Sequence, residues 1–358
     1  MAYLAPMLPA VVLGIIGGAL ADRFGTKNVV TVGVILCVPG IWFRYMAENF
    51  ITLFILCMMS GLSAALMSPN AAKILGAWFS PKQLGFAMGL YFSGATVGST
   101  LAVATTALFP SQKAAYTTAG IVALISAITW IAFVRNKPKG APDVPPEPIL
   151  KYMKVAARSK NTWFISIFFM LIMGATMAQG GGLINALITD RGVDPVQAGF
   201  INSVATIGMV AGILILPAWA GKIGRYKPFL GPLAIVGGII TLIFWKLPVS
   251  SYWFIMPLSG FLGAAAMPLL KAYPVLLDEI GPEYAGSAGG IISTMQLLGA
   301  FFIPSFIIAP VAGLNFQILL YMCGGLAIVA GIIALLLPEV GHKMRQTGQA
   351  EAPTSESV

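Results

Sequence analysis

The sequence predicts an all-α polytopic membrane protein, and composition and hydrophobic patterning carry that prediction. Of its 358 residues, 58% are hydrophobic and 9% are charged, and the mean hydropathy is +0.88. An ordinary soluble domain has about 25% charged residues. Apolar runs of about 20 residues, the length that spans a bilayer as a helix, recur along the whole chain. The composition therefore excludes a soluble protein, and the run length excludes a β-barrel, whose strands are shorter and alternate in hydrophobicity.

Eleven apolar runs are predicted to span the membrane, at residues 3–22, 28–47, 50–69, 84–107, 113–135, 162–189, 197–218, 228–247, 252–277, 284–310 and 314–337. The longest segment between them, Asn136 to Asn161, is rich in proline and charge and predicts a flexible linker. The expected domains are an N-terminal half, a linker, a C-terminal half and a polar tail, at residues 1–135, 136–161, 162–338 and 339–358.

The positions of the basic residues predict the orientation in the membrane. Sixteen of the 21 Lys and Arg residues fall in segments on one side, and four fall on the other: Arg44, Lys113, Arg191 and Lys246. Because loops rich in Lys and Arg stay in the cytoplasm, we expect a multi-pass protein of the cell membrane with a cytoplasmic C-terminus. The net charge of +9 is then a topology signal and indicates no nucleic-acid partner. The expected partners are the lipid bilayer and a small molecule, and the expected state is a monomer.

The first basic loop carries the most specific motif, Gly18-Ala-Leu-Ala-Asp-Arg-Phe-Gly-Thr-Lys27. Gly25 permits a tight turn, and Asp22 beside Arg23 offers a charge pair that could hold one conformation shut. The loop resembles the signature loop between helices 2 and 3 of the major facilitator superfamily. The residues that match its pattern are Gly18, Leu20, Ala21, Asp22, Arg23, Gly25 and Lys27, whereas Thr26 departs from it.

The resemblance implies a major facilitator fold, with twelve helices in two pseudo-symmetric halves. A weaker copy of the loop, Ala218 to Arg225, lies 199 residues after its counterpart, Ala19 to Thr26, as parallel halves would place it. The same offset puts the counterpart of the run at 162–189 before Met1. We therefore expect 11 of the 12 helices here, namely family helices 2 to 12, with the first one lacking.

Strict Gly-x-x-x-Gly spacings, which let membrane helices approach closely, occur in the runs assigned to family helices 2, 5, 8 and 11. The resemblance implies that helix 2 meets helix 11, and helix 5 meets helix 8, across the two halves. We therefore predict that these glycines form the interface between the halves; the alternative is chance spacing in a chain with 40 glycines. The predicted interface residues are Gly14, Gly94, Gly98, Gly208, Gly212, Gly286 and Gly290, and the predicted gating residues are those of the loop motif: Gly18, Asp22, Arg23, Gly25 and Lys27.

Lys271 is the ionisable residue that falls deep inside a predicted span and not near one of its ends, which is a costly position and marks a candidate functional site. No carboxylate falls similarly deep inside a span to pair with it, so Lys271 is predicted to bind an anionic substrate. The alternative is that Lys271 extends to the membrane surface. Ser259 lies on the same helical stripe.

Two amides in the run at 162–189 are further substrate-binding candidates. Gln179 and Asn185 are six residues apart, which is about 240° around a helix, so at most one of them faces the cavity well. Asn185 could instead bridge two helices, a common use of an amide in lipid. The run also carries three consecutive glycines after Gln179, a predicted flexible point.

No phosphate-binding loop, dinucleotide fingerprint, nucleophile elbow or metal-ligand cluster is present in the sequence, so no enzyme activity, catalytic residue, metal or cofactor is predicted. The resemblance implies a secondary active transporter working by alternating access, and Lys271 favours an organic or inorganic anion as substrate. The stretch from Pro69 to Gly89 resembles branches that carry nitrate, cyanate and oxalate, although family helices 2 and 8 lack the arginines of the nitrate branch. The absence of intramembrane carboxylates favours exchange over proton symport. The alternatives are proton-driven drug or metabolite efflux and a transport-inactive, truncated remnant.

Overall fold

The computed structural model of the chain describes residues 7–106, 108–136, 148–313 and 315–340. All regular structure in these residues is helical, which confirms the predicted all-α class. The helices are α1 (Met7–Phe24), α2 (Thr26–Trp42), α3 (Phe50–Trp78), α4 (Pro81–Thr106), α5 (Gln112–Phe133), α6 (Ile149–Arg158), α7 (Lys160–Thr189), α8 (Pro195–Ile223), α9 (Gly231–Ile243), α10 (Tyr252–Leu276), α11 (Gly281–Phe302), α12 (Ala309–Ala312) and α13 (Phe316–Leu335). Short 3₁₀ turns and one π-helical segment extend them: η2 (Phe43–Met46), η3 (Lys227–Phe229), η4 (Phe244–Lys246), η5 (Val249–Ser251) and η6 (Ile303–Ile308).

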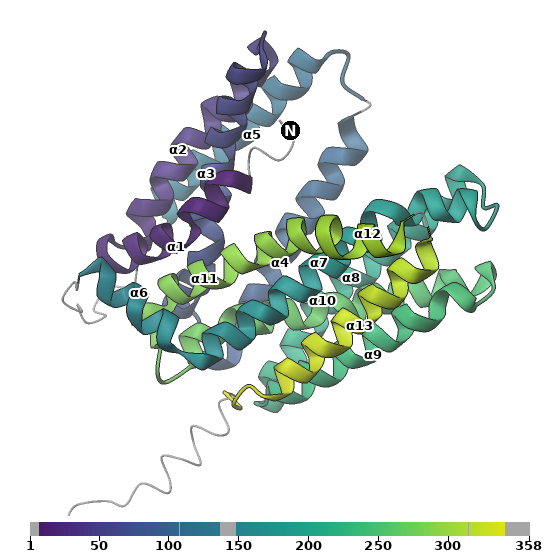
Figure 1. Cartoon of the computed structure of the whole chain (residues 1–358). Helices are drawn as coiled ribbons and strands as arrows, with labels where there is room; N and C mark the ends of the chain where they lie inside the picture. The colour runs from purple at the N-terminus through teal and green to yellow at the C-terminus, as the bar shows by residue number, and fades with distance from the viewer. Residues whose placement is uncertain (1–6, 107, 137–147, 314, 341–358) are drawn as a thin grey trace, which may run out of the picture.

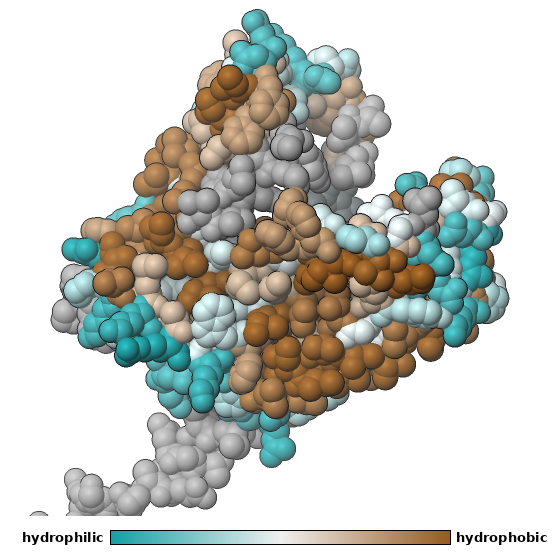
Figure 2. All heavy atoms as spheres, in the orientation of Figure 1, coloured by the Kyte–Doolittle hydropathy of each residue, from teal (hydrophilic) through white to brown (hydrophobic). Residues whose placement is uncertain are grey.

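Within the described ranges, nine helical segments are long and apolar enough to cross a membrane: Thr26–Met46, Phe50–Trp78, Gln112–Phe133, Lys160–Thr189, Pro195–Ile223, Lys227–Lys246, Val249–Leu276, Gly281–Ala312 and Phe316–Leu335. Helices α1 and α4 occupy the other two predicted ranges, 3–22 and 84–107. Large apolar side chains on the outside of the bundle, such as Phe133 and Phe254, are about four-fifths exposed, as lipid-facing residues are. Figure 2 shows the apolar surface that these helices present.

Side chains at the helix starts satisfy backbone N–H groups that have no partner within the helix. Asn49 caps α3, Ser111 caps α5, Ser159 caps α7 and Asp194 caps α8 through hydrogen bonds to the backbone. Gly25, with a φ of +84°, makes the tight turn between α1 and α2, in a region of backbone space that favours glycine. These local signals place the loops where the sequence pattern predicts them.

The helices form two groups that meet at one end and diverge toward the other (Figure 1). We call α1–α5 the N-terminal group and α7–α13 the C-terminal group. The groups touch where α1 and α3 pack on α11 and where α4 packs on α8 and α10. We call the end that carries Phe24, Trp78 and Ile223 the linker end, and the other end the far end. The largest buried cluster includes Ala71 of α3 and Val275 of α10, so both groups contribute to the core that closes the linker end.

The predicted flexible linker, residues 136–161, is partly wrong, because residues 149–158 form the helix α6. Its buried residues, Tyr152 and Ala156, are one turn apart and face the bundle. The Tyr152 ring lies 5.5 Å, centroid to centroid, from the ring of Tyr284 on α11. The amphipathic pattern of α6 was present in the sequence but is short and flanked by prolines. The prolines at 138, 142 and 145–146 lie outside the described residues.

The predicted tail also begins later than residue 339. The carboxylate of Glu339 accepts hydrogen bonds from the backbone N–H groups of Tyr226 (2.7 Å) and Lys227 (3.1 Å), so this residue is anchored to the linker end. The remainder of the predicted tail, residues 341–358, lies outside the described part of the chain.

The four basic residues that the sequence places on the opposite side from the linker each contact an aromatic ring. The cation lies 4.7–5.8 Å from the ring centroid in the pairs Arg44–Tyr116, Lys113–Tyr45, Arg191–Trp245 and Lys246–Tyr321. Such contacts hold the positive charges at the ends of the helices, next to amphipathic rings. They lie at the far end, which separates them from the basic residues of the linker end.

Candidate substrate cavity and closed linker end

A cavity of about 360 Å³ lies among the helices of the C-terminal group, with Phe92 and Thr96 of α4 completing its wall. Its polar lining consists of neutral side chains: Thr96, Thr176, Gln179, Asn202, Thr206, Thr241, Ser259 and Gln296. No charged side chain is among the lining residues in the described part of the chain. The cavity therefore offers hydrogen-bond donors and acceptors to a small solute without a fixed charge in its wall.

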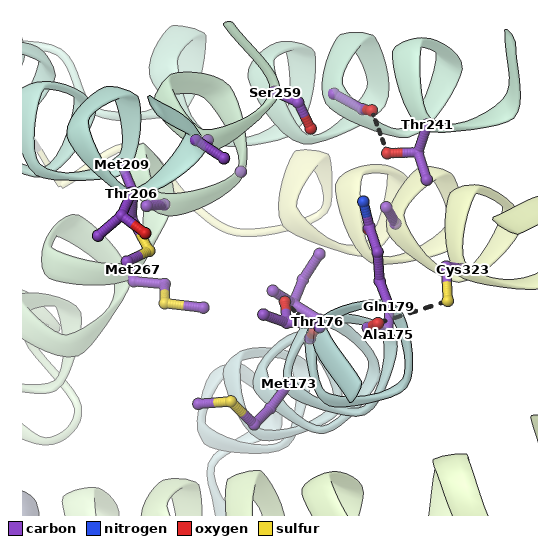
Figure 3. Close-up of a pocket in the computed structure, with 18 of the residues that line it drawn as sticks. Met173, Ala175, Thr176, Gln179, Thr206, Met209, Thr241, Ser259, Met267 and Cys323 are labelled. Atoms are coloured by element: carbon purple, nitrogen blue, oxygen red, sulfur yellow. Dashed lines mark hydrogen bonds between the residues drawn. The ribbon is translucent and has the colours of Figure 1, made fainter. Parts of the chain in front are cut away.

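Sulfur-containing side chains make up much of the apolar lining. Met173, Met209, Met256 and Met267 surround the cavity, and the Cys323 thiol donates a hydrogen bond of 3.4 Å to the Ala175 carbonyl (Figure 3). Thioethers are flexible and polarisable, so they adapt to solutes of different shape. No sequence pattern distinguishes these residues, because methionines at helical spacing are equally common in ordinary cores.

The two candidate amides of α7 lie in different surroundings. Gln179 lines the cavity and extends from α7 toward the side of Thr241 (Figure 3), whereas Asn185 is exposed and is not among the lining residues. This is the separation that six residues of helix produce. Ser259 of α10 also lines the cavity. Gln179 and Ser259 thus line the same cavity, whereas Asn185 lies outside it.

Lys271 lies one turn of α10 beyond the cavity-lining Met267 and is 4% exposed. Its Nζ donates a hydrogen bond of 2.8 Å to Ser293 Oγ of α11 and lies 5.0 Å from the centroid of the Phe169 ring. Ser293 Oγ is in turn 3.4 Å from Ser68 Oγ of α3, across the boundary between the two groups. The alternative prediction, that the side chain extends to the membrane surface, does not hold in this structure. The described contacts of Lys271 include no carboxylate.

The Asp22 side chain is fully buried at the linker end and joins the two groups. Its Oδ1 lies 2.7 Å from Lys73 Nζ of α3 and accepts a hydrogen bond of 3.1 Å from the Gly286 backbone N–H of α11. Its Oδ2 accepts hydrogen bonds of 2.8 Å from both the backbone N–H and the hydroxyl of Ser287. One carboxylate therefore connects α1, α3 and α11, and burial in a place of low dielectric makes these charge-assisted bonds strong.

The prediction of a charge pair between Asp22 and Arg23 within the motif is wrong. Arg23 is exposed, and its guanidinium lies 5.2 Å over the neighbouring Phe24 ring, while Asp22 pairs with Lys73. Adjacent residues of a helix point in directions about 100° apart, so Asp22 can face the bundle only if Arg23 faces away. In the sequence, Lys73 resembles any other basic residue that marks the membrane topology.

Lys27, the last residue of the motif, holds the N-terminal group together and makes no described contact with the other group. Its Nζ donates a hydrogen bond of 3.0 Å to the Ile131 carbonyl near the end of α5, and its backbone N–H donates one of 2.6 Å to Asn136. A cation near the last carbonyls of a helix is favourable. Of the predicted gating residues, Gly18 and Asp22 thus contact the other group, whereas the contacts described for Arg23, Gly25 and Lys27 lie within the N-terminal group.

Only part of the predicted glycine interface lies between the two groups. A Cβ at Gly14 would lie 2.8 Å from Thr294 Oγ1, one at Gly290 would lie 2.5 Å from the Gly14 carbonyl, and Gly18 faces the Gly286 carbonyl. Gly208 and Gly212 instead face Pro257 and Phe261 of α10, within the C-terminal group, and Gly94 and Gly98 face open space. The placement of these last four between the halves is therefore wrong in this structure. Close helix approach needs small residues, but the spacing does not tell which neighbour approaches.

The close approach of α1 and α11 predicts the effect of a methyl group at this contact. We expect Gly18→Ala to lower the free energy of unfolding by about 1–3 kcal/mol. The new Cβ would clash with the Gly286 backbone carbonyl, which cannot move aside without separating the two helices. The matched control is Gly94→Ala, at a glycine in a helix interior that faces open space, and this change is expected to raise the free energy of unfolding by about 0.5–1 kcal/mol. Thermal unfolding of the purified variants measures both, and equal losses would contradict the close approach.

A second contact between the groups involves Tyr226, in the loop that copies the motif. Gly221 stands where the first loop has Asp22, and Gly221 itself packs on the Lys82 carbonyl. The Tyr226 hydroxyl donates a hydrogen bond of 2.8 Å to the Pro81 carbonyl at the start of α4. Burial, reinforced by the nearby Glu339 carboxylate, raises the pKa of Tyr226 to about 12, which extends to higher pH the range in which the phenol keeps its proton. No pattern in the sequence points to this residue.

Membrane-length helices in two groups, closed together at one end and enclosing a cavity, define a helical membrane transport protein. The chain belongs to the Major Facilitator Superfamily, whose sequence model matches residues 1–304 and 170–357. It is 24% identical, over 84% of its length and 76% of the relative's, to the "Probable nitrate/nitrite transporter NarK2" of Mycobacterium tuberculosis. It is 24% identical to the hexuronate transporter of Bacillus subtilis over 96% of this chain and 86% of that one. The human organic anion transporter MFSD10 has the same fold, with a TM-score of 0.78 at 14% identity, covering 93% and 82% of the two chains.

Proposed function

We propose that this protein is a secondary transporter that moves a small organic or inorganic anion by alternating access. The observation that carries the proposal is Lys271, a cation buried one helical turn beyond the cavity, with a hydroxyl and a ring as its contacts. A buried ammonium is costly unless it meets an anion. The lysine stem is long enough to cover one helical turn, so Nζ can leave Ser293 and reach a solute in the cavity.

The related transporters support the choice of an anion. Nitrate, nitrite and hexuronates all carry negative charge, and these are the solutes in the names of the two relatives described above. In our proposal the neutral lining residues Gln179 and Ser259 donate hydrogen bonds to the anion, and Lys271 supplies the charge. Because the described lining of the cavity carries no fixed charge, we propose that the shape of the cavity selects which anion binds.

Alternating access requires that the linker end open while the far end closes. We propose that residues 1–135 and 162–338 move as two halves joined by residues 136–161. The excess of Lys and Arg at the linker end supports a cytoplasmic placement of that end and of the C-terminus. The structure then corresponds to a state that is closed to the cytoplasm, and opening requires the bonds from Asp22 to Gly286 and Ser287 to break.

Exchange of anions is the coupling that the cavity supports best. Among the described residues that line it there is no carboxylate, which is the group that a proton-coupled carrier would protonate during transport. A thermal-shift screen of the purified protein with nitrate, small carboxylates and uncharged sugars tests the substrate class. We expect anions to raise the melting temperature and sugars to leave it unchanged; stabilisation by sugars alone would contradict the proposal.

The amides of α7 give a matched pair of variants for the cavity. We expect Gln179→Ala to raise KM by roughly 2- to 12-fold with little change in kcat, because one hydrogen bond to the solute contributes about 0.5–1.5 kcal/mol. Asn185→Ala, on the same helix but outside the cavity, is expected to leave both constants unchanged. Uptake of glucuronate and nitrate into proteoliposomes measures the constants. A larger effect at Asn185 than at Gln179 would place the site elsewhere.

Efflux of amphipathic compounds is a second candidate, favoured by the thioether-rich lining. Four methionines and Phe92 line the cavity, as a site for apolar solutes of variable shape requires. Competition separates the two functions. An anion carrier loses its uptake signal when a second anion is added, whereas a carrier of amphipathic compounds is inhibited by uncharged aromatic compounds and not by nitrate.

A further inference from the structure

A second cavity, of about 420 Å³, lies at the linker end where α6 meets α1, α7 and α11. We call it the α6 groove and define it by Leu150, Met153, Ala157, Trp163, Ile291 and Met295. It shares no lining residue with the substrate cavity. The groove is apolar apart from Lys154 and Thr294, which lie among its lining residues.

The side of α6 that lines the groove differs from the side that packs on the bundle. Tyr152 and Ala156 are buried against the protein, whereas Leu150, Met153 and Ala157, spaced three and four residues apart, lie along the groove. Leu150 is 74% exposed. The helix thus has an apolar face that the described part of the protein does not cover.

Basic residues follow the edge of this apolar face. Lys151, Lys154 and Arg158 recur at helical spacing on α6, and Lys154 itself lines the groove. Within the described ranges no carboxylate lies within salt-bridge distance of Lys154 or Arg158. The nearby Glu279 carboxylate accepts hydrogen bonds from Ser159 and Asn161 instead. Figure 2 shows hydrophilic residues gathered where α6 lies in Figure 1, beside apolar surface.

We propose that the α6 groove binds an anionic phospholipid, with an acyl chain along the apolar lining and the headgroup phosphate at Lys154 and Arg158. Charge complementarity selects this occupant, because basic residues beside an apolar face attract anionic lipid at the membrane surface. Trp163 supports a position of the groove near the membrane surface. Its indole N–H donates a hydrogen bond of 2.8 Å to the Ala157 carbonyl, and the residue is 41% exposed. Tryptophan is enriched at the boundary between hydrocarbon and headgroups.

The position of the groove connects lipid binding to the closed linker end. Ile15 of α1 and Thr294 of α11 both line it, and Gly14, the neighbour of Ile15, packs against Thr294. A lipid in the groove therefore touches both helix groups and stabilises the state in which α1 and α11 are in contact. Since a ligand shifts an equilibrium only by binding one state better, an anionic lipid is expected to favour closure.

Native mass spectrometry of the purified full chain tests the proposal directly. The protein in detergent is titrated with dioleoylphosphatidylglycerol or with dioleoylphosphatidylcholine, and bound lipid is counted. We expect the wild type to retain phosphatidylglycerol preferentially. Lys154→Gln combined with Arg158→Gln is expected to weaken that binding roughly 30-fold, the size expected for two basic side chains near an anionic headgroup.

Two further variants separate the groove from general surface charge. Lys222→Gln with Arg225→Gln removes two exposed basic residues at the same end but on α8 and the loop after it, and is expected to leave lipid retention unchanged. Ala157→Phe fills the groove and is expected to reduce retention while the basic residues remain.

Equal retention of the two lipids by the wild type would overturn the proposal, and so would an equal loss in the α8 control. Displacement of the lipid by millimolar inorganic phosphate would show a site for free phosphate and would also overturn it. Because no step uses the substrate cavity, these outcomes do not depend on the anion transport proposed above.

Discussion

Replacing Lys271 with methionine is expected to abolish most anion transport while leaving the protein folded. Removing one member of a buried charge pair costs about 2–5 kcal/mol, so kcat/KM for nitrate or glucuronate should fall by roughly 30-fold to several thousandfold. Methionine keeps the length and volume of the side chain next to Phe169 and removes the charge. Uptake into proteoliposomes, with the melting temperature measured in parallel, gives both results.

The melting temperature distinguishes substrate binding from a structural role of Lys271. Without substrate, the buried ammonium has Ser293 and the Phe169 ring as its described contacts, so its removal should leave the melting temperature unchanged or raise it. Lys271→Arg keeps the charge and should restore part of the transport. A lower melting temperature together with normal uptake in Lys271→Met would show that the lysine only joins α10 to α11.

Replacing Asp22 with asparagine is expected to open the linker end. The variant loses the charge that meets Lys73 and turns one acceptor oxygen into an amide N–H₂ that faces other donors from Ser287 or Lys73. Truncating a buried, hydrogen-bonded charge costs about 2–5 kcal/mol, so the closed state should lose at least about 30-fold in population relative to the open state.

Alkylation of a cysteine placed in the closed core measures this opening. Ala72 of α3 is 6% exposed in the core to which both groups contribute, so Ala72→Cys, with Cys37, Cys57 and Cys323 replaced, should react slowly with an impermeant maleimide added to the linker side. Asp22→Asn should raise the rate of that reaction at least about tenfold, because the lost charge is expected to lower the population of the closed state relative to the open state by more than that factor. Asp190→Asn, whose exposed carboxylate contacts Thr189 at the far end, is the control. Equal rates in the two variants would show that Asp22 does not hold the end closed.

The fold was accessible from the sequence because lipid imposes a simple pattern. A bilayer requires about 20 apolar residues per helix, and each of the eleven predicted runs contains a helix in the structure. The loop at Asp22 was found through residue identity at fixed spacing. Lys271 was found because a single charge within an apolar run is visible without any knowledge of neighbours.

The contacts between helices were not accessible in the same way. Gly208 and Gly18 have the same local spacing, yet the first packs on α10 and the second on α11. The face that a glycine presents depends on how the helix is rotated in the bundle, and spacing within one helix does not contain that angle. Lys73 and Tyr226 join the site through tertiary contacts alone, so each was indistinguishable from an ordinary loop residue.

Counterflow in proteoliposomes tests the central proposal, transport of an anion by alternating access, most directly. Vesicles containing the wild-type protein are loaded with unlabelled glucuronate or nitrate, and entry of the labelled anion from outside is measured. The proposal predicts transient accumulation of label that requires the internal anion, is suppressed by a second external anion and is lost in Lys271→Met. Accumulation of an uncharged amphipathic compound that nitrate and glucuronate do not inhibit, with no counterflow of either anion, would contradict it.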